Sequence, residues 1–500
     1  MSEPVGSTAA APARRRARSL AIFALVAFAL AFQGTRGIWD TDEGRYTAVA
    51  LRMLRTGDWF TPTLSHDVPH FSKPPLTYWA LASSIGLFGR NEWAARLPNA
   101  FAFVATVLLT GAIARRLAPG REELAAVVQA TSLLPFVAAN VVTTDTLLTA
   151  FETLAVAGFV EHRFGGADRR LPLYAMWLGF GLAFLTKGPP GLLPLVALLA
   201  FSLWTDGGRA TLRLLRPLGL ALFAAVALGW YVAQLRVRPD LLGYLLGAEV
   251  VERVSSDAFN RSPGLAGILK QYAPVLLVGA LPWWPWAAAR AWPRRREILE
   301  PRRDPVFRLV GLWLLVPLAV FLVSSSRLPL YLLPLSVPAS LAIARAPPAD
   351  ALAPLRRRRM LALWVLLLIG LKGLGGVWES DRDGRRRARE LAAILPYPPA
   401  ELVMVNRKPP YSLSFYFDVD VERVALESIS PPEQEPSYRP LLEPLRAGLA
   451  QQKRATVWLV PKRLDEVFLG ELEAAGWRGR PMAEIEGLGV FLEPRPAAPR

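Results

Sequence analysis

Long apolar runs, separated by short polar connections, follow one another along the first three quarters of the chain. Many of them approach the roughly 20 residues that a helix needs to cross a bilayer. Several runs are short or interrupted by proline, which leaves the number of spans open. The pattern predicts an α-helical polytopic membrane protein with spans near Leu20–Phe32, Leu97–Ala114, Leu124–Ala139, Thr146–Val160, Leu171–Leu185, Gly188–Leu203, Leu214–Leu235, Tyr272–Ala289, Val306–Val323, Leu328–Ala344 and Leu361–Val377.

The pattern changes after Val377, where apolar runs become short and alternate with polar, proline-rich segments. Period-two alternation and helical spacing both occur there, as in a water-soluble domain. We therefore expect a membrane domain over residues 1–378 and a small extracytoplasmic α/β domain over residues 379–500. The strands are predicted at Leu402–Val405, Val421–Leu426, Thr456–Val460 and Val490–Leu492, and the helices at Tyr438–Gln451 and Leu464–Ala475.

Charge supports one orientation of the predicted spans. The formal net charge is +17, but arginine gathers in short connections between apolar runs rather than on one basic domain, so a nucleic-acid binder is not indicated. The clusters fall on alternate connections, on the same side as the basic N-terminal segment, which is the distribution of cytoplasmic loops. No small-residue cleavage site follows the first apolar run, so we expect an uncleaved helix.

The side opposite the arginine clusters carries the candidate chemistry. It receives the first external loop, about residues 36–80, and the large external loop, about residues 236–271. The chain has no cysteine and three histidines, which excludes disulfides, zinc–thiolate sites, thiol nucleophiles and a histidine-rich metal site.

The first external loop combines acids and bases with an apolar helical pattern. Ala48, Val49, Leu51 and Leu54 are spaced as in an amphipathic helix lying along the membrane interface. The charged residues precede this helix or follow it, and a solvated charged loop is the alternative. They are Asp40, Asp42, Glu43, Arg45 and Lys73.

Glycosyl transfer requires these residue types. A carboxylate can take a proton from the acceptor or orient it, and cations can stabilise a departing phosphate. Asp42 and Glu43 are the candidate acids. The candidate cations that could converge on a lipid phosphate are Arg45, Lys73, Lys187 and Arg327.

Structural explanations for the same residues stay open. Glu43 could pair with a neighbouring arginine, Lys187 could be a helix-end lysine whose ammonium reaches the interface, and Tyr331 could be a packing residue.

Four stretches together resemble a known family. Residues 39–75 contain DEGRY, TGDWFTP and FSKPP, and TTDTLLTAF, FLTKGPPGLLP and SSSRLPLYLLPLSVP follow at Thr143–Phe151, Phe184–Pro194 and Ser324–Pro338. In this order they resemble the polyprenyl-phosphate-sugar glycosyltransferases. The lipid A aminoarabinose transferases are the nearer relatives and the protein O-mannosyltransferases the more distant ones.

The resemblance implies a GT-C type glycosyltransferase fold and a set of site residues. Asp42 would be the catalytic or orienting carboxylate, with Glu43 beside it. The residues implied to bind the donor phosphate, the sugar or the acceptor are Arg45, Tyr46, Lys73, Asp145, Lys187, Glu249, Arg253, Arg327 and Tyr331.

The resemblance fails at the family's metal-ligand positions. The aminoarabinose transferases have a glutamate before the loop lysine and a Glu-His pair in the large loop, whereas this chain has Ser72 and then Glu249 followed by Val250. The resemblance therefore does not support a divalent metal bound in that manner; metal dependence stays open, and no other cofactor is indicated.

The expected activity is inverting transfer of a sugar from a polyprenyl phosphate, undecaprenyl phosphate by the resemblance, to lipid A, another glycan or a protein at the periplasmic face of a bacterial inner membrane. The alternatives are a lipid-linked saccharide transporter or flippase, which would place ionisable groups near the bilayer midplane in broken helices, and an inactive lipid-binding scaffold. The sugar, the acceptor and the oligomeric state stay open.

Overall fold

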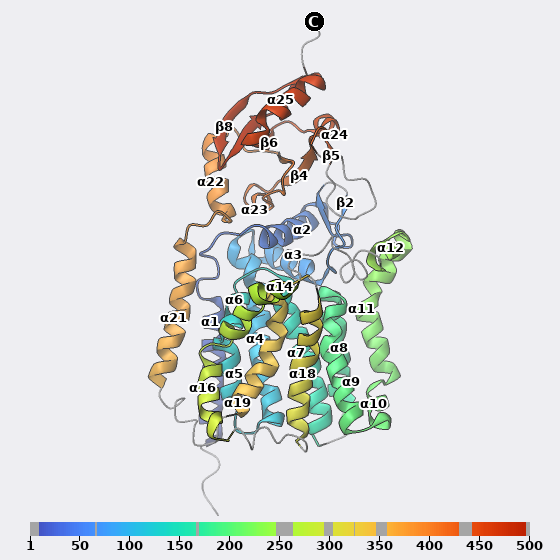
Figure 1. The fold of residues 1–500 in the computed structure, drawn as a ribbon, viewed down its shortest axis with the longest axis vertical. Helices are drawn as coiled ribbons and strands as arrows, with labels where there is room; N and C mark the ends of the chain where they lie inside the picture. The colour runs from blue at the N-terminus through green and yellow to red at the C-terminus, as the bar shows by residue number, and fades with distance from the viewer. Residues whose placement is uncertain are drawn as a thin grey trace, which may run out of the picture. The chain divides into compact units, whose positions relative to one another are not determined.

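The computed structural model describes residues 10–65, 68–166, 170–246, 264–294, 304–324, 326–346, 358–429 and 443–496. The chain divides into two compact units, which are described one at a time (Figure 1). The first consists of residues 1–35, 96–231 and 256–376, and the second of residues 36–95, 232–255 and 377–500.

The first unit is helical throughout its described residues. Its elements, of which α4 begins and α11 ends in the second unit, are α1 (Ala10–Leu30), α4 (Glu92–Leu117), α5 (Glu122–Thr131), α6 (Leu133–Ala138), α7 (Thr144–Phe164), α8 (Arg170–Lys187), η1 (Pro189–Leu192), α9 (Leu193–Thr205), α10 (Gly208–Leu214), α11 (Pro217–Val237), α14 (Gly264–Gln271), α15 (Ala273–Val278), α16 (Trp283–Ala291), η4 (Trp292–Arg294), α18 (Pro305–Val323), η6 (Pro329–Leu335), α19 (Ser336–Arg345) and α21 (Arg358–Val377).

Among the described helices, α4, α11, α18 and α21 are long and apolar enough to cross a membrane, and a pair bent by 69°, α14–α15 with α16, is a further candidate. Four predicted spans are not single α-helices. The run 124–139 breaks at Ser132, whose backbone is extended, and the runs 188–203, 272–289 and 328–344 break or begin as 3₁₀ turns beside prolines. Proline causes such breaks because it has no N–H to donate and clashes with the preceding turn.

Helices α7 and α8 pack unusually closely because glycine lies where they touch. A Cβ on Gly158 would lie 2.5 Å from the Pro172 carbonyl oxygen, and one on Gly179 would lie 2.6 Å from the Ala155 nitrogen. Small residues let helix backbones approach one another within membranes. The contact fixes the first turn of α7 against the last turn of α8.

The second unit combines the first external loop with the C-terminal sheet domain. Its elements are α2 (Asp42–Thr56), β1 (Thr63–Ser65), β2 (Val68–Pro69), α3 (Leu76–Phe88), α12 (Leu241–Leu246), α22 (Gly384–Ile394), β3 (Glu401–Val405), α23 (Ser412–Phe417), β4 (Asp420–Ala425), β5 (Glu443–Pro444), α24 (Leu445–Gln451), β6 (Thr456–Pro461), η8 (Lys462–Leu464), α25 (Asp465–Ala474), β7 (Trp477–Arg478), β8 (Pro481–Ile485), β9 (Leu488–Leu492) and β10 (Arg495–Pro496).

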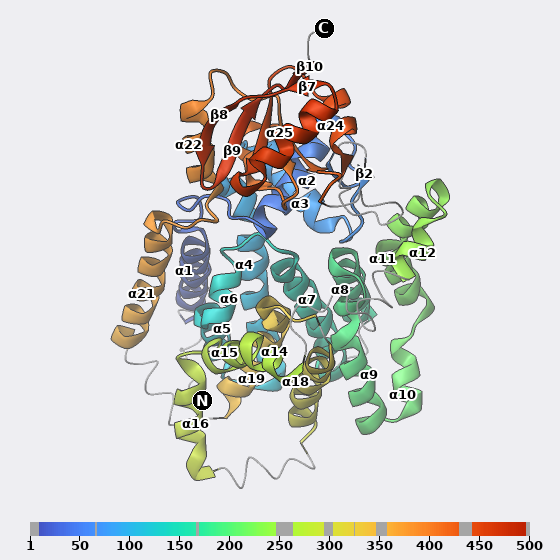
Figure 2. The same cartoon turned by 45° about the horizontal axis from the view of Figure 1, so that its top comes forward.

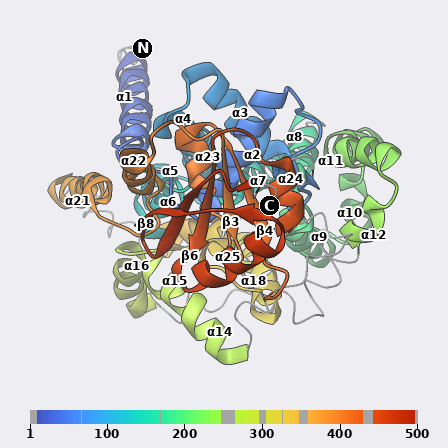
Figure 3. The same ribbon diagram turned by 90° about the horizontal axis from the view of Figure 1, so that it is seen from above.

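The main sheet has the strand order β5-β4-β3-β6-β9-β8 (Figures 2 and 3). Strands β5, β4, β3 and β6 are parallel to one another, and β9 is antiparallel to both of its neighbours, β6 and β8. Helices α24 and α25 cover one face and bury Trp458, Phe468 and Phe491 with it. The predicted α/β domain is confirmed, including its four strands and both helices, but the helix predicted at Tyr438–Gln451 begins only at Leu445, because Glu443 and Pro444 form the short strand β5.

Candidate functional site

The candidate catalytic acid Asp42 begins helix α2. Its side chain is 49% exposed, and its Oδ1 accepts a hydrogen bond of 2.8 Å from the Arg45 guanidinium one turn later. The Arg45 guanidinium also lies 5.5 Å from the centre of the buried Tyr46 ring, in a cation–π arrangement. Asp42 is therefore oriented by Arg45 and still accessible.

The helix carrying Asp42 is more deeply buried than its pattern predicts. Residues from Tyr46 to Met53 are all buried, because α3, α23 and β1 pack around α2. The prediction of a helix is confirmed, but α2 does not have the one exposed face of an interfacial helix. Burial of Glu43, Gly44 and residues 46–53 makes the first turn of α2 a firm support for Asp42.

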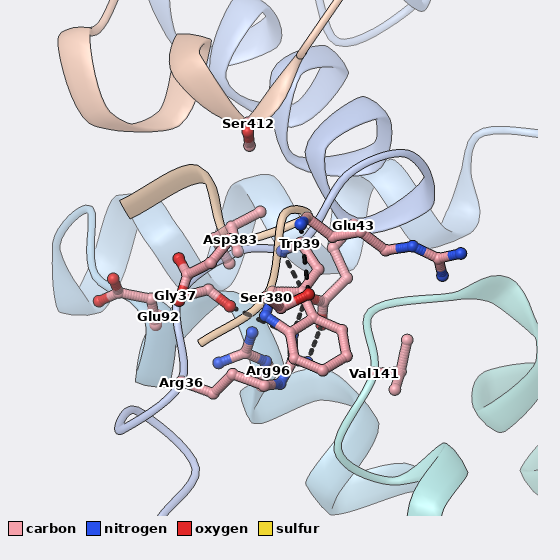
Figure 4. A network of polar contacts seen from close by, with 12 residues as sticks. Arg36, Gly37, Trp39, Glu43, Glu92, Arg96, Val141, Ser380, Asp383 and Ser412 are labelled. Atoms are coloured by element: carbon pink, nitrogen blue, oxygen red, sulfur yellow. Dashed lines mark hydrogen bonds and ion pairs between the residues drawn. The ribbon is translucent and has the colours of Figure 1, made fainter. Parts of the chain in front are cut away.

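Glu43 is held by the chain segment before the helix (Figure 4). The Arg36 guanidinium donates to both carboxylate oxygens at 2.8 Å, and the Trp39 amide donates to Oε2 at 2.9 Å. The Glu43 side chain is 2% exposed. These contacts match the structural explanation for Glu43, with Arg36 as the neighbouring arginine.

Asp40 lies at the contact between this loop and the C-terminal part of the second unit. It accepts hydrogen bonds from the Ser412 amide at 2.9 Å, from the Ser412 hydroxyl at 2.5 Å and from Arg387 at 3.1 Å. Burial raises the pKa of Asp40 to about 6, while Ser412 and Arg387 oppose that rise. A carboxylate with both oxygens occupied is poorly suited to act as the base.

The end of the loop places a neutral histidine among cations. His70 is buried, and its Nε2 lies 2.7 Å from the Ser72 hydroxyl. Burial, together with the charges of Arg45 and Lys73, lowers the pKa of His70 to about 3. The Lys73 ammonium donates to the Ser72 carbonyl at 2.6 Å. These side chains form an electropositive group beside α2.

In the first unit, the predicted residues Asp145, Lys187 and Tyr331 come together. The Lys187 ammonium forms an ion pair with Asp145 and lies 4.1 Å from the centre of the Tyr331 ring. Both charged side chains are 8% exposed. Asp145 lies in the first turn of α7 and Lys187 in the last turn of α8, so each charge also complements the dipole of its own helix.

Arg327 lies in the same unit, before η6. It is 3% exposed and donates to the Leu322 carbonyl at 2.9 Å, near the end of α18. It also donates to the Gly264 carbonyl at 3.4 Å, so both of these hydrogen bonds go to the backbone.

The predicted residues Glu249 and Arg253 lie outside the described residues, so the large-loop prediction stays a prediction. The convergence of the first-loop group and the first-unit group on one phosphate likewise stays a prediction. Ser72, at the family's metal-ligand position, bonds to His70. Within the described ranges, no three His, Asp or Glu side chains are grouped to hold a metal ion.

Three further residues have environments that the sequence did not predict: Ser412 and Arg387, which contact Asp40, and Glu152, which is buried in the first unit. Ser412 and Arg387 lie more than 340 residues after Asp40, a separation at which no pattern in one sequence indicates contact. Glu152 is 3% exposed on α7, and its Oε2 has no hydrogen-bond partner among the described residues. A lone glutamate within an apolar run was the available signal for it.

The fold is of the GT-C type, as comparison with a solved structure shows. The structure superimposes on ArnT from Cupriavidus metallidurans bound to undecaprenyl phosphate with a TM-score of 0.77, at 20% identity, over 95% of this chain and 98% of that chain. The apo form of that protein gives 0.75. At this identity the match establishes the fold.

Sequence comparison points to the same class. Residues 72–232 match the family described as dolichyl-phosphate-mannose-protein mannosyltransferase. Undecaprenyl phosphate-alpha-4-amino-4-deoxy-L-arabinose arabinosyl transferases from Erwinia tasmaniensis and Pseudomonas fluorescens are both 32% identical, over 62% and 69% of this chain. The matches span 55% and 62% of those relatives' own lengths. The predicted resemblance is confirmed: this chain is similar to the polyprenyl-phosphate-sugar glycosyltransferases and shares their fold.

Proposed function

We propose that this protein transfers a sugar from a polyprenyl phosphate to lipid A or another lipid or glycan acceptor. The proposed polyprenyl phosphate is undecaprenyl phosphate. The relatives' names supply the donor class, and the donor sugar they name is 4-amino-4-deoxy-L-arabinose. The proposed location is a bacterial inner membrane, with the first external loop and the C-terminal domain on the periplasmic side, as the arginine distribution indicates.

The observation that carries the proposal is the different environment of the three acids around the start of α2. Asp40 and Glu43 are buried with their oxygens occupied, whereas Asp42 is half exposed and oriented by Arg45. A general base must reach the proton that it takes. Asp42 is the acid in this group that fits the requirement.

In the proposed reaction, Asp42 takes the proton of an acceptor hydroxyl as that oxygen attacks the anomeric carbon. The bond between this carbon and the phosphate oxygen breaks on the opposite face, which inverts the configuration, and polyprenyl phosphate leaves with the bonding electrons. Arg45 and Lys73 are proposed to stabilise the negative charge that develops on the phosphate. Lys187, Arg327 and Tyr331 are proposed to bind the donor, and Glu249 and Arg253 the sugar or acceptor.

The test uses the full chain, purified in detergent and supplied with a labelled panel of undecaprenyl-phosphate sugars and with lipid A. The proposal expects transfer from at least one donor and its loss in Asp42→Asn, with unchanged thermal stability. The control is Asp58→Asn, a change in an exposed acid of the same loop. Transfer by Asp42→Asn at the wild-type rate would refute the assignment. Movement of a labelled donor across vesicles without transfer would favour the transporter.

A further inference from the structure

The segment that leads into α2 is fixed by residues far along the chain, all in the second unit. The Ile38 amide donates to the Tyr416 hydroxyl at 2.8 Å, and the Ile38 carbonyl accepts from the Gly384 amide at 2.9 Å. The Asp40 amide donates to the Arg382 carbonyl at 2.9 Å. Backbone groups on both sides of Asp40 are thus bound to the C-terminal part of the unit.

The Asp40 side chain adds three hydrogen bonds to this junction. One oxygen accepts from the Ser412 amide, and the other accepts from the Ser412 hydroxyl and from Arg387. Asp40 is 9% exposed and Arg387 15%. Arg387 also forms an ion pair of 2.8 Å with Glu486, so the sheet domain stabilises the contact between Arg387 and Asp40.

Glycine makes this close approach possible. A Cβ on Gly44, in the first turn of α2, would lie 2.5 Å from the Ser412 amide nitrogen, and one on Gly384 would collide with the Ser412 side chain. The two backbones touch at α2 and α23 without an intervening side chain. Any rearrangement at Ser412 is therefore transmitted directly to the first turn of α2.

We propose that Asp40 is a positioning residue for sugar transfer, which fixes the first turn of α2, and with it Asp42, through its contacts with Ser412 and Arg387. The inference rests on the proposed function. It makes the C-terminal domain a support for the candidate catalytic carboxylate. A misplacement of about 1 Å far from the reacting atoms can reduce the rate about 100-fold.

The ionised form of Asp40 makes the contact with Arg387. Among the described residues, the charge of Lys408 also lowers the pKa of Asp40, and Asp40 in turn raises the pKa of Tyr411; both residues precede α23. With the pKa of Asp40 at about 6, transfer should increase with pH through that value. Removal of the Arg387 side chain should move this increase in transfer to higher pH, because its positive charge opposes the rise in the pKa of Asp40 that burial causes.

The experiment compares Asp40→Ala, Asp40→Asn and Arg387→Ala with Arg386→Ala in the full chain. Arg386 is the matched control, because it also pairs with Glu486, at 2.6 Å, but has no described contact with Asp40. We expect kcat to fall about 100-fold in Asp40→Ala, with KM for the undecaprenyl-phosphate sugar unchanged. Arg386→Ala should keep the wild-type kcat.

The pH profile separates positioning from general stability. The transfer rate of the wild type should rise with pH near pH 6. In Arg387→Ala this rise should occur at higher pH, and in Asp40→Asn it should be absent at this pH. If Asp40→Ala fails to fold, the Asn and Arg387 variants carry the test alone. The inference is wrong if an active wild type keeps its kcat in Asp40→Ala, or if the rise with pH survives in Asp40→Asn. A wild type that transfers no sugar from any donor removes the proposed function as well.

Discussion

The buried ion pair between Asp145 and Lys187 gives the sharpest prediction about stability. Replacing Asp145 by Asn keeps the shape of the side chain but leaves the Lys187 ammonium without its carboxylate in an environment where both side chains are 8% exposed. Removing one partner of a buried pair costs about 3–5 kcal/mol, because the other charge stays desolvated. The cation–π contact between Lys187 and Tyr331, worth about 0.5–2 kcal/mol, is available in both proteins and therefore does not reduce this difference.

The double variant Asp145→Asn with Lys187→Met should recover most of the stability, since neither charge remains buried. The quantity to measure is the coupling free energy, which is the difference between the effect of the double variant and the sum of the effects of the two single variants. Thermal unfolding in detergent, followed by tryptophan fluorescence, compares wild type, both single variants and the double variant. The matched control is Glu161→Gln, which breaks an exposed pair with Arg116, where the expected change is below about 1 kcal/mol.

Two results would refute this reasoning. Additive effects of the two changes would mean that Asp145 and Lys187 do not stabilise each other. An effect of Asp145→Asn no larger than that of Glu161→Gln would mean that the pair is solvated. If the proposed function also holds, the stable double variant should still lose transfer, because its donor-binding cation is gone.

The remaining predictions concern helix packing and buried titratable groups. Gly158→Val should lower the unfolding temperature in detergent by several degrees, since its Cβ would lie 2.6 Å from the Met176 nitrogen; an unchanged midpoint would contradict the close contact. Glu152→Gln should unfold no earlier than wild type, because the buried Oε2 has no hydrogen-bond partner among the described residues; a large loss would reveal an essential charge. His70, with its pKa lowered to about 3, should remain neutral, so the stability that it contributes is complete above about pH 6.5 and is lost as pH falls from there toward 3. The stability of His70→Gln should therefore change less with pH over this range than that of the wild type. The same change in both proteins would contradict the lowered pKa of His70.

Local patterns predicted the parts of the fold that depend on neighbouring residues. The buried strands at Leu402–Val405 and Thr456–Val460 stand out as short apolar runs, and the structure has strands there. Helix α22 was missed because its sequence, GRRRARELAAI, has few apolar positions. Asp383 caps its N-terminal end, and Arg386 and Arg387 pair with Glu486, 100 and 99 residues later.

Two kinds of information about the site could not come from one sequence. Asp40 and Asp42 are the same residue type two positions apart, and only burial distinguishes the occupied carboxylate from the accessible one. The partner of Glu43 proved to be Arg36, which lies outside the loop motifs. Lys187 and Asp145 were each predicted from their motifs, but their direct pairing depends on how α7 and α8 pack.

The contacts of Ser412 with the first loop also bear on the order of biosynthesis. Residues 36–56 are translated early, but their partners at 380–416 follow some 340 residues later. Domains fold as they emerge, beginning from the N-terminal end. The contacts of the first loop with residues 380–416 therefore cannot form until most of the chain has been synthesised. Nascent chains released before Ser412 should keep α2 open to proteases, and the protein should become competent only when synthesis is almost complete.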